Sequence, residues 1–229
     1  MQNIEQNLKK IRAEINEFEK QAKRVPDSVQ LLAVSKKKST DLIVDAYHAG
    51  QRLFGESYVQ EALAKIEKLN QYSDIEWHFI GPIQSNKTRD IANHFNWVHS
   101  VDRIKIIRRL NEQRSDQLAP LNICLQVNID AEETKSGFLA DEILLVAQDV
   151  LGLKNIKLRG LMAIPKPRTD EKQQRETFHK VQQLFSAMQS LSVDVDTLSL
   201  GMSGDMSAAI AEGSSMVRIG TAIFGERDV

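Results

Sequence analysis

The chain has 229 residues, 41% of them hydrophobic, and its 30 lysines and arginines nearly balance its 31 aspartates and glutamates, giving a net charge of −1. This composition is typical of a globular protein with a sizeable core, and it excludes a disordered or fibrous chain. No apolar run is long enough to span a membrane, and residues 1–20 lack the apolar region of a secretory signal, so we expect neither a transmembrane protein nor a secretory signal. A single cysteine, Cys124, and a neutral charge balance predict a cytoplasmic protein with no membrane partner and no general affinity for nucleic acid.

The first predicted elements are an amphipathic helix and a buried strand. The helix is indicated by apolar residues spaced three or four apart, namely Ile4, Leu8, Ile11, Ile15 and Phe18. Residues 29–34 then form a short, mostly apolar run of the kind found in buried parallel strands. A second helix is expected to start at the capping residues 39–41 and to end at Gly50.

The same alternation continues to the C-terminus. Further strands are expected at residues 52–55, 76–81, 97–101, 122–129, 157–164, 197–200 and 216–219. Helices are expected between them at residues 59–69, 85–94, 103–113, 140–151, 171–191 and 206–212. We find no linker and no internal repeat in this pattern.

Eight strands that alternate with helices predict a parallel sheet with helices on its outside. An open doubly wound sheet usually carries a Gly-rich turn after its first strand, where this chain has Ser35-Lys36-Lys37-Lys38. We therefore favour a single domain over residues 1–229, a closed (β/α)8 TIM barrel of the α/β class with an extra N-terminal helix packed outside it.

Lys36 follows the first strand with only Ser35 between them, so its side chain should begin at the mouth of the barrel. The neighbouring Lys37 and Lys38 disfavour another positive charge and would promote the neutral amine that forms a Schiff base. A solvated basic turn is the alternative interpretation of these lysines. The position at a strand end favours chemistry without deciding the matter.

The last two strand-to-helix turns indicate an anion site. Gly201-Met202-Ser203-Gly204-Asp205 and Gly220-Thr221-Ala222 combine small residues with hydroxyls, and backbone N–H groups can approach a ligand there. Each turn alone could be an ordinary tight turn with Ser as a cap. Because both lie in the last two units, the usual phosphate site of this barrel, they favour a phosphorylated ligand at Ser203, Gly220 and Thr221.

A lysine that forms a Schiff base and a phosphate site on the same barrel face suggest pyridoxal 5′-phosphate (PLP). Strand alternation can place Arg218 on the same inward side as Gly220, where a permanent cation would keep the pyridine nitrogen unprotonated and weaken the ring as an electron sink. A salt-bridged arginine is the alternative for Arg218. His78 is either a pocket residue or a hydrogen-bonded structural histidine, Cys124 is expected to be a small buried residue, and no histidine has a spacing that predicts a metal site.

Several motifs resemble the pyridoxal phosphate homeostasis proteins, the relatives of the barrel of bacterial alanine racemase. They are the segments at residues 32–36, 54–61, 77–87, 135–137, 160–164, 200–205 and 217–225. The resemblance implies that Lys36 carries PLP as a Schiff base, that Ser203, Gly220 and Thr221 hold its phosphate and that Arg218 faces the pyridine nitrogen. Ser57 stands where the family usually has asparagine, and its shorter side chain reaches less far toward a cofactor.

The resemblance also implies a carrier or regulator of PLP, vitamin B6 and amino-acid balance, with no catalytic residues. The related racemase has a second domain that supplies an opposing acid or base, whereas only residues 226–229 follow Gly225 here. We expect a monomer whose partners are PLP and the apo forms of PLP-dependent enzymes. Two alternatives are a PLP-dependent racemase-like enzyme or Schiff-base aldolase that uses Lys36, and a nucleic-acid binder that uses the basic turn.

Overall fold

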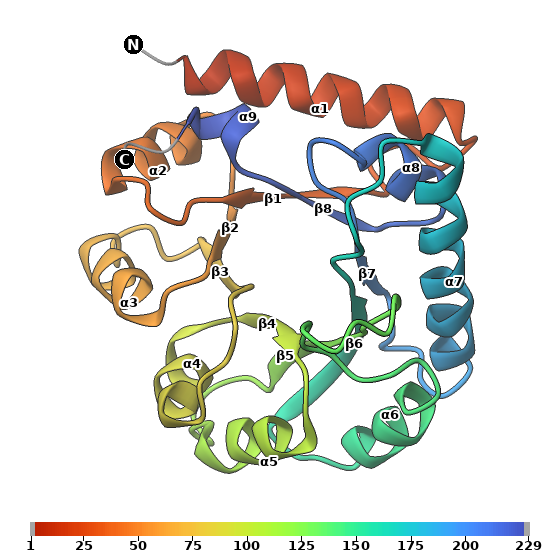
Figure 1. The fold of residues 1–229 in the computed structure, drawn as a ribbon. Helices are drawn as coiled ribbons and strands as arrows, with labels where there is room; N and C mark the ends of the chain where they lie inside the picture. The colour runs from red at the N-terminus through yellow and green to blue at the C-terminus, as the bar shows by residue number, and fades with distance from the viewer. Residues whose placement is uncertain (1–2, 227–229) are drawn as a thin grey trace.

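Eight short parallel strands close into a barrel in chain order, because β1 pairs with β2 on one side and with β8 on the other. The computed structural model describes residues 3–226, so the calls at residues 1–2 and 227–229 lie outside the described part. The strands are β1 Gln30–Val34, β2 Leu53–Glu56, β3 Glu76–Phe79, β4 Trp97–Val101, β5 Leu121–Gln126, β6 Ile156–Met162, β7 Thr197–Ser199 and β8 Met216–Ile219. The predicted closed (β/α)8 barrel is confirmed (Figure 1).

Helices surround the barrel as the alternation predicts (Figure 1). They are α1 Ile4–Gln21, α2 Thr40–His48, α3 Val59–Lys68, α4 Thr88–His94, α5 Ile104–Gln113, α6 Ile143–Leu151, α7 Glu171–Gln189, α8 Met206–Ala211 and α9 Thr221–Phe224, with a 3-10 turn, η1, at Ser85–Lys87. The helix expected at 85–94 is divided between η1 and α4, and the strand expected at 122–129 ends at Gln126. Beyond it, Val127 forms an isolated bridge with Phe138.

The main hydrophobic core lies between the sheet and the helices, where nearly every strand contributes apolar side chains on its outer side. A second, small cluster of buried side chains consists of Trp97, Cys124 and Met162. As expected, Cys124 is fully buried, and burial raises the pKa of its thiol to about 12. This thiol therefore stays protonated and unreactive.

The N-terminal helix α1 packs outside the barrel against α2, α8 and α9, as predicted (Figure 1). Asn3 begins the helix by accepting a hydrogen bond from the backbone N–H of Gln6 at 2.9 Å. Ile4, Leu8, Ile11 and Ile15 form its buried stripe. The Asn7 side chain also donates to the carbonyl of Ile223, so α1 is bonded to α9, the short helix that follows the last strand.

Candidate functional site

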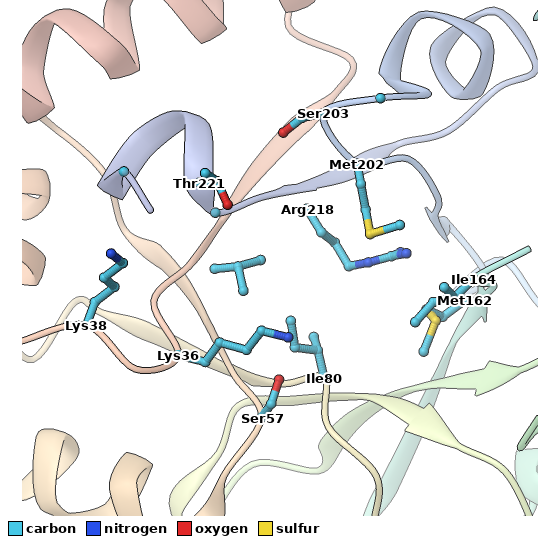
Figure 2. A pocket seen from close by; sticks show the side chains of 14 residues that line it. Lys36, Lys38, Ser57, Ile80, Met162, Ile164, Met202, Ser203, Arg218 and Thr221 are labelled. Atoms are coloured by element: carbon cyan, nitrogen blue, oxygen red, sulfur yellow. The ribbon is translucent and has the colours of Figure 1, made fainter. Parts of the chain in front are cut away.

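A cavity of about 330 Å³ opens at the carboxyl ends of the strands. Volumes of this size are typical of sites for small ligands. It is lined by Val34, Lys36, Lys38, Ser57, Ile80, Met162, Ile164, Met202, Ser203, Gly204, Arg218, Gly220, Thr221 and Gly225. All five residues predicted to bind a cofactor therefore line the same cavity (Figure 2). Ser57 lines the cavity too. Its backbone lies against Gly81, where a Cβ would be 2.2 Å from the Ser57 carbonyl oxygen, so this approach requires a glycine.

Lys36 lies in the turn after β1 and extends into the cavity (Figure 2). The turn is tight, because the backbone N–H of Lys38 donates to the carbonyl of Ser35 at 3.0 Å and Lys37 has a φ of 58°. Lys38 also lines the cavity, but its amine donates to the carbonyl of Glu226. The basic run is therefore divided, with Lys36 and Lys38 at the cavity and Lys37 outside its lining.

A buried network holds the residues on both sides of Lys36. The Lys65 amine of α3 lies 2.8 Å from the Ser35 carbonyl, 2.8 Å from Glu56 and 2.6 Å from Glu61. The Ser35 hydroxyl donates to Glu56, and the backbone N–H of Lys37 donates to Glu61, both at 2.6 Å. Burial raises the pKa of Glu56 in spite of its contact with Lys65.

Strand ends alone do not predict this buried network, although the sequence carries two signals of it. Glu61 and Lys65 are four residues apart, the spacing of a helical ion pair. Glu56 also shares a strand side with Phe54, which is buried in the outer core, so its side chain must point to the helices and away from the cavity. The strand-end residue Glu56 is thus part of the support for the Lys36 turn and does not line the cavity.

The turns after β7 and β8 present a set of backbone donors to the cavity. Met202 and Asp205 close the first turn, because the Asp205 carboxylate accepts the Met202 N–H at 2.6 Å. Within residues 3–226, several backbone N–H groups here have no hydrogen-bond acceptor, namely those of Ser203, Gly204, Gly220, Thr221 and Ala222. With the hydroxyls of Ser203 and Thr221, these groups can bind an anion.

Arg218 reaches the cavity from β8, although only 5% of its surface is exposed. One terminal nitrogen donates to the carbonyl and to the hydroxyl of Ser199, and the other donates to the carbonyl of Ala163 at 3.0 Å. A guanidinium has five N–H donors. Two of these, one terminal and one on Nε, therefore have no acceptor within the described residues. Burial lowers the Arg218 pKa to about 10, so the side chain remains a cation at neutral pH.

The two histidines His78 and His99 are fully buried and do not line this cavity. His78 is fully buried and contacts His99, so of its two interpretations the structure supports the hydrogen-bonded structural histidine. No group of three or more metal-binding side chains occurs in residues 3–226. Among the helices of the same part of the chain, none is both long and apolar enough to span a membrane.

Known proteins match the chain along almost its whole length. The family model for the alanine racemase N-terminal domain matches residues 6–228. The pyridoxal phosphate homeostasis proteins of Vibrio alginolyticus and Pseudomonas aeruginosa are each 51% identical to it, over 100% of this chain and 99% and 97% of their own. The structure of PipY from Synechococcus elongatus PCC7942 with PLP bound is 34% identical, with a TM-score of 0.83 over 97% of this chain and 100% of that chain.

Proposed function

The chain belongs to the alanine racemase N-terminal domain family, among its pyridoxal phosphate homeostasis proteins, and on this premise we propose that it binds PLP as a Schiff base on Lys36. In this proposal Ser203, Gly220 and Thr221 bind the phosphate and Arg218 faces the pyridine nitrogen. The whole chain, residues 1–229, acts as one PLP-binding domain in the cytoplasm. Its role is to hold and supply PLP in vitamin B6 and amino-acid homeostasis.

The observation that carries the proposal is the arrangement of unlike groups around one cavity. An amine lies in the turn after β1, backbone donors that have no acceptor among residues 3–226 lie after β7 and β8, and a buried cation lies between these two sides. PLP has an aldehyde that reacts with an amine, a phosphate that needs hydrogen-bond donors and a ring nitrogen that needs a polar partner. The donor set of the cavity therefore fits PLP.

Arg218 supports a carrier more than a catalyst. When bound, PLP can serve as an electron sink, and a protonated ring nitrogen strengthens it in that role. The guanidinium of Arg218 can only donate hydrogen bonds, so it would leave the ring nitrogen unprotonated. Among the described residues that line the cavity, no carboxylate, imidazole or phenol stands opposite Lys36 as a second acid or base.

Absorption spectroscopy of the purified protein tests the proposal. With PLP added, the wild-type protein should be yellow, and borohydride followed by peptide mass spectrometry should place the reduced cofactor on Lys36. Lys36→Ala should lose the imine band and retain weaker PLP binding through the phosphate turns and Arg218. Lys37→Ala, which changes a lysine outside the cavity, is the matched control. A colourless wild-type protein, or label on another lysine, would refute the assignment.

A further inference from the structure

Four buried polar side chains form a continuous hydrogen-bonded chain inside the barrel. The guanidinium of Arg218 donates to the Ser199 hydroxyl at 3.0 Å, and that oxygen lies 2.9 Å from Nδ1 of His99. Nε2 of His99 in turn lies 2.9 Å from Nδ1 of His78. Ser199, His99 and His78 have no exposed surface. The chain begins at the residue that lines the cavity and runs away from the cavity into the barrel.

All the hydrogen bonds of this hydrogen-bonded chain run in one direction, from Arg218 toward His78. Arg218 can only donate, so the Ser199 oxygen accepts from it, and its own proton then goes to Nδ1 of His99. His99 therefore carries its proton on Nε2 and donates to Nδ1 of His78, which leaves the His78 proton on Nε2. Either direction leaves Nε2 of His78 without a partner within the described residues. The reverse direction would also leave the buried Ser199 hydroxyl proton with no acceptor there, so it has one more unsatisfied group.

Both imidazoles are held in place as neutral rings. Burial, together with the charge of Arg218, lowers the pKa of His99 to about 3, and burial with the neighbouring His99 lowers that of His78 well below 6.5. His78 stacks on Trp97 with a centroid distance of 5.4 Å and an interplanar angle of 8°. Its Nε2 is buried and has no partner within the described residues, so the chain ends there.

We propose that His99, supported by His78 and acting through the Ser199 hydroxyl, is a positioning residue that fixes the guanidinium of Arg218 where it faces the ring nitrogen of PLP. Arg218 forms no ion pair within the described residues, so neutral acceptors alone hold its plane. Hydrogen bonds that donate in series polarise one another. Nδ1 of His78, the last acceptor in the series, therefore influences how firmly the guanidinium of Arg218 is held at the cavity.

The first test needs no cofactor. Nitrogen-15 NMR of the histidine-labelled apo protein should show one tautomer for each buried ring, with Nδ1 of His99 unprotonated and its Nε2 protonated. Ser199→Ala should change the Nδ1 resonance of His99, whereas Trp97→Phe should leave the tautomer unchanged. A proton on Nδ1 of His99, or a mixture of tautomers, would overturn the directed chain.

The second test rests on the proposed function and uses two probes, PLP and its analogue with C–H in place of the ring nitrogen. His99→Phe should weaken PLP binding by about tenfold, the effect of one lost hydrogen bond. It should leave the affinity for the analogue unchanged. His99→Asn, which keeps an acceptor near the Nδ1 position, should restore most of the affinity, and Trp97→Phe controls for packing.

The outcomes separate the two proposals. Equal loss for both probes would mean that His99 acts only through general packing, which overturns the positioning role. Should His99→Phe fail to fold, Ser199→Ala gives the same comparison with a smaller change in volume. If neither probe binds the wild-type protein, the proposed function fails, and the apo NMR experiment still decides whether the directed chain exists.

Discussion

At the scale of single residues, the hydroxyls of Ser203 and Thr221 are the most direct test of the phosphate site. Each lines the cavity beside backbone N–H groups that lack acceptors within the described residues. A hydrogen bond to a charged group contributes about 1–3 kcal/mol. Thr221→Val and Ser203→Ala should therefore each raise the dissociation constant for PLP by roughly 5- to 150-fold, measured by absorption titration.

A matched control for these hydroxyls is Thr169→Val, because Thr169 is exposed and lies outside the cavity. It should bind PLP as the wild-type protein does. The affinity for pyridoxal without phosphate should change little in any of the three variants. An unchanged dissociation constant for PLP in both Thr221→Val and Ser203→Ala would rule out these turns as the phosphate site.

His78 and His99 make the stability of the protein depend on pH. Their pKa values are lowered in the folded state, to about 3 for His99, while in the unfolded chain they return to about 6.5. Below about pH 6.5 the unfolded chain therefore binds protons that the folded state accepts only at lower pH, about pH 3 for His99. The contribution of these histidines to the free energy of unfolding is complete above pH 6.5 and is lost as the pH falls through this window.

Each histidine should add about 1.4 kcal/mol per pH unit to the slope of that loss. Urea unfolding of the apo protein at pH 7, 6 and 5 measures it. His99→Asn removes one titrating ring, so its free energy of unfolding should fall less steeply than that of the wild-type protein. Parallel slopes for the two proteins would contradict the buried neutral state of His99.

At the scale of elements, the order and type of the strands could be predicted because the apolar runs and helical periods alternate without interruption. The four residues of α9 are too few to show a helical period, so it was not predicted. The hydrogen-bonded chain from Arg218 to His78 could not be predicted in the same way, because its prediction requires the register between strands. Alternation along β4 can place Trp97 and His99 on one side, but only the barrel brings His99 within 2.9 Å of Ser199, one hundred residues away.

The connection between α1 and β1 depends on the buried carboxylate of Glu19, which is only 2% exposed. It accepts the backbone N–H groups of Asp27 and Val29 and the hydroxyl of Ser28, at 3.1, 2.8 and 3.0 Å. Glu19→Ala would leave these donors without their acceptor, so we expect a loss of about 2–5 kcal/mol in the free energy of unfolding. Thermal and urea unfolding measure it.

The neighbouring carboxylate Glu17 is exposed on the same helix and provides the control. Glu17→Ala should change the free energy of unfolding by less than about 0.5 kcal/mol. The PLP affinity of folded Glu19→Ala should stay close to that of the wild-type protein, since Glu19 does not line the cavity. A Glu19→Ala protein as stable as Glu17→Ala would show that the loop does not depend on this carboxylate.

At the scale of the whole molecule, the barrel supplies one face for ligand binding, and five of the cavity residues could be located from strand ends alone. Lys36, Ser203, Arg218, Gly220 and Thr221 were predictable because parallel strands bring their carboxyl ends together. The residues that support them were harder to predict, since Lys65 and Glu61 lie on a helix and contact the backbone of the Lys36 turn. The expectation that the protein works as a monomer stays a prediction. Light scattering in solution tests this state.

The distinction between carrier and enzyme also belongs to the whole molecule. Racemisation removes a proton from one face of the substrate and returns it on the other, which requires two placed bases around an electron-withdrawing ring. The described cavity offers Lys36 but no opposing carboxylate, imidazole or phenol, and Arg218 disfavours a protonated ring nitrogen. We therefore predict negligible racemase, transaminase, decarboxylase or aldolase turnover, together with measurable transfer of PLP to an apo-enzyme.

The assay should compare the PLP-loaded wild-type protein with Lys36→Ala and with free PLP at the same concentration. Transfer is followed by the activity that an apo-enzyme gains, and turnover by chiral chromatography of amino acids left with the loaded protein. Because a carrier must release what it binds, recovery of the apo-enzyme should be accompanied by loss of the imine band from the donor. Steady turnover of an amino acid by the wild-type protein that disappears in Lys36→Ala would instead identify an enzyme, since a carrier has no reason to consume substrate at the residue that holds PLP.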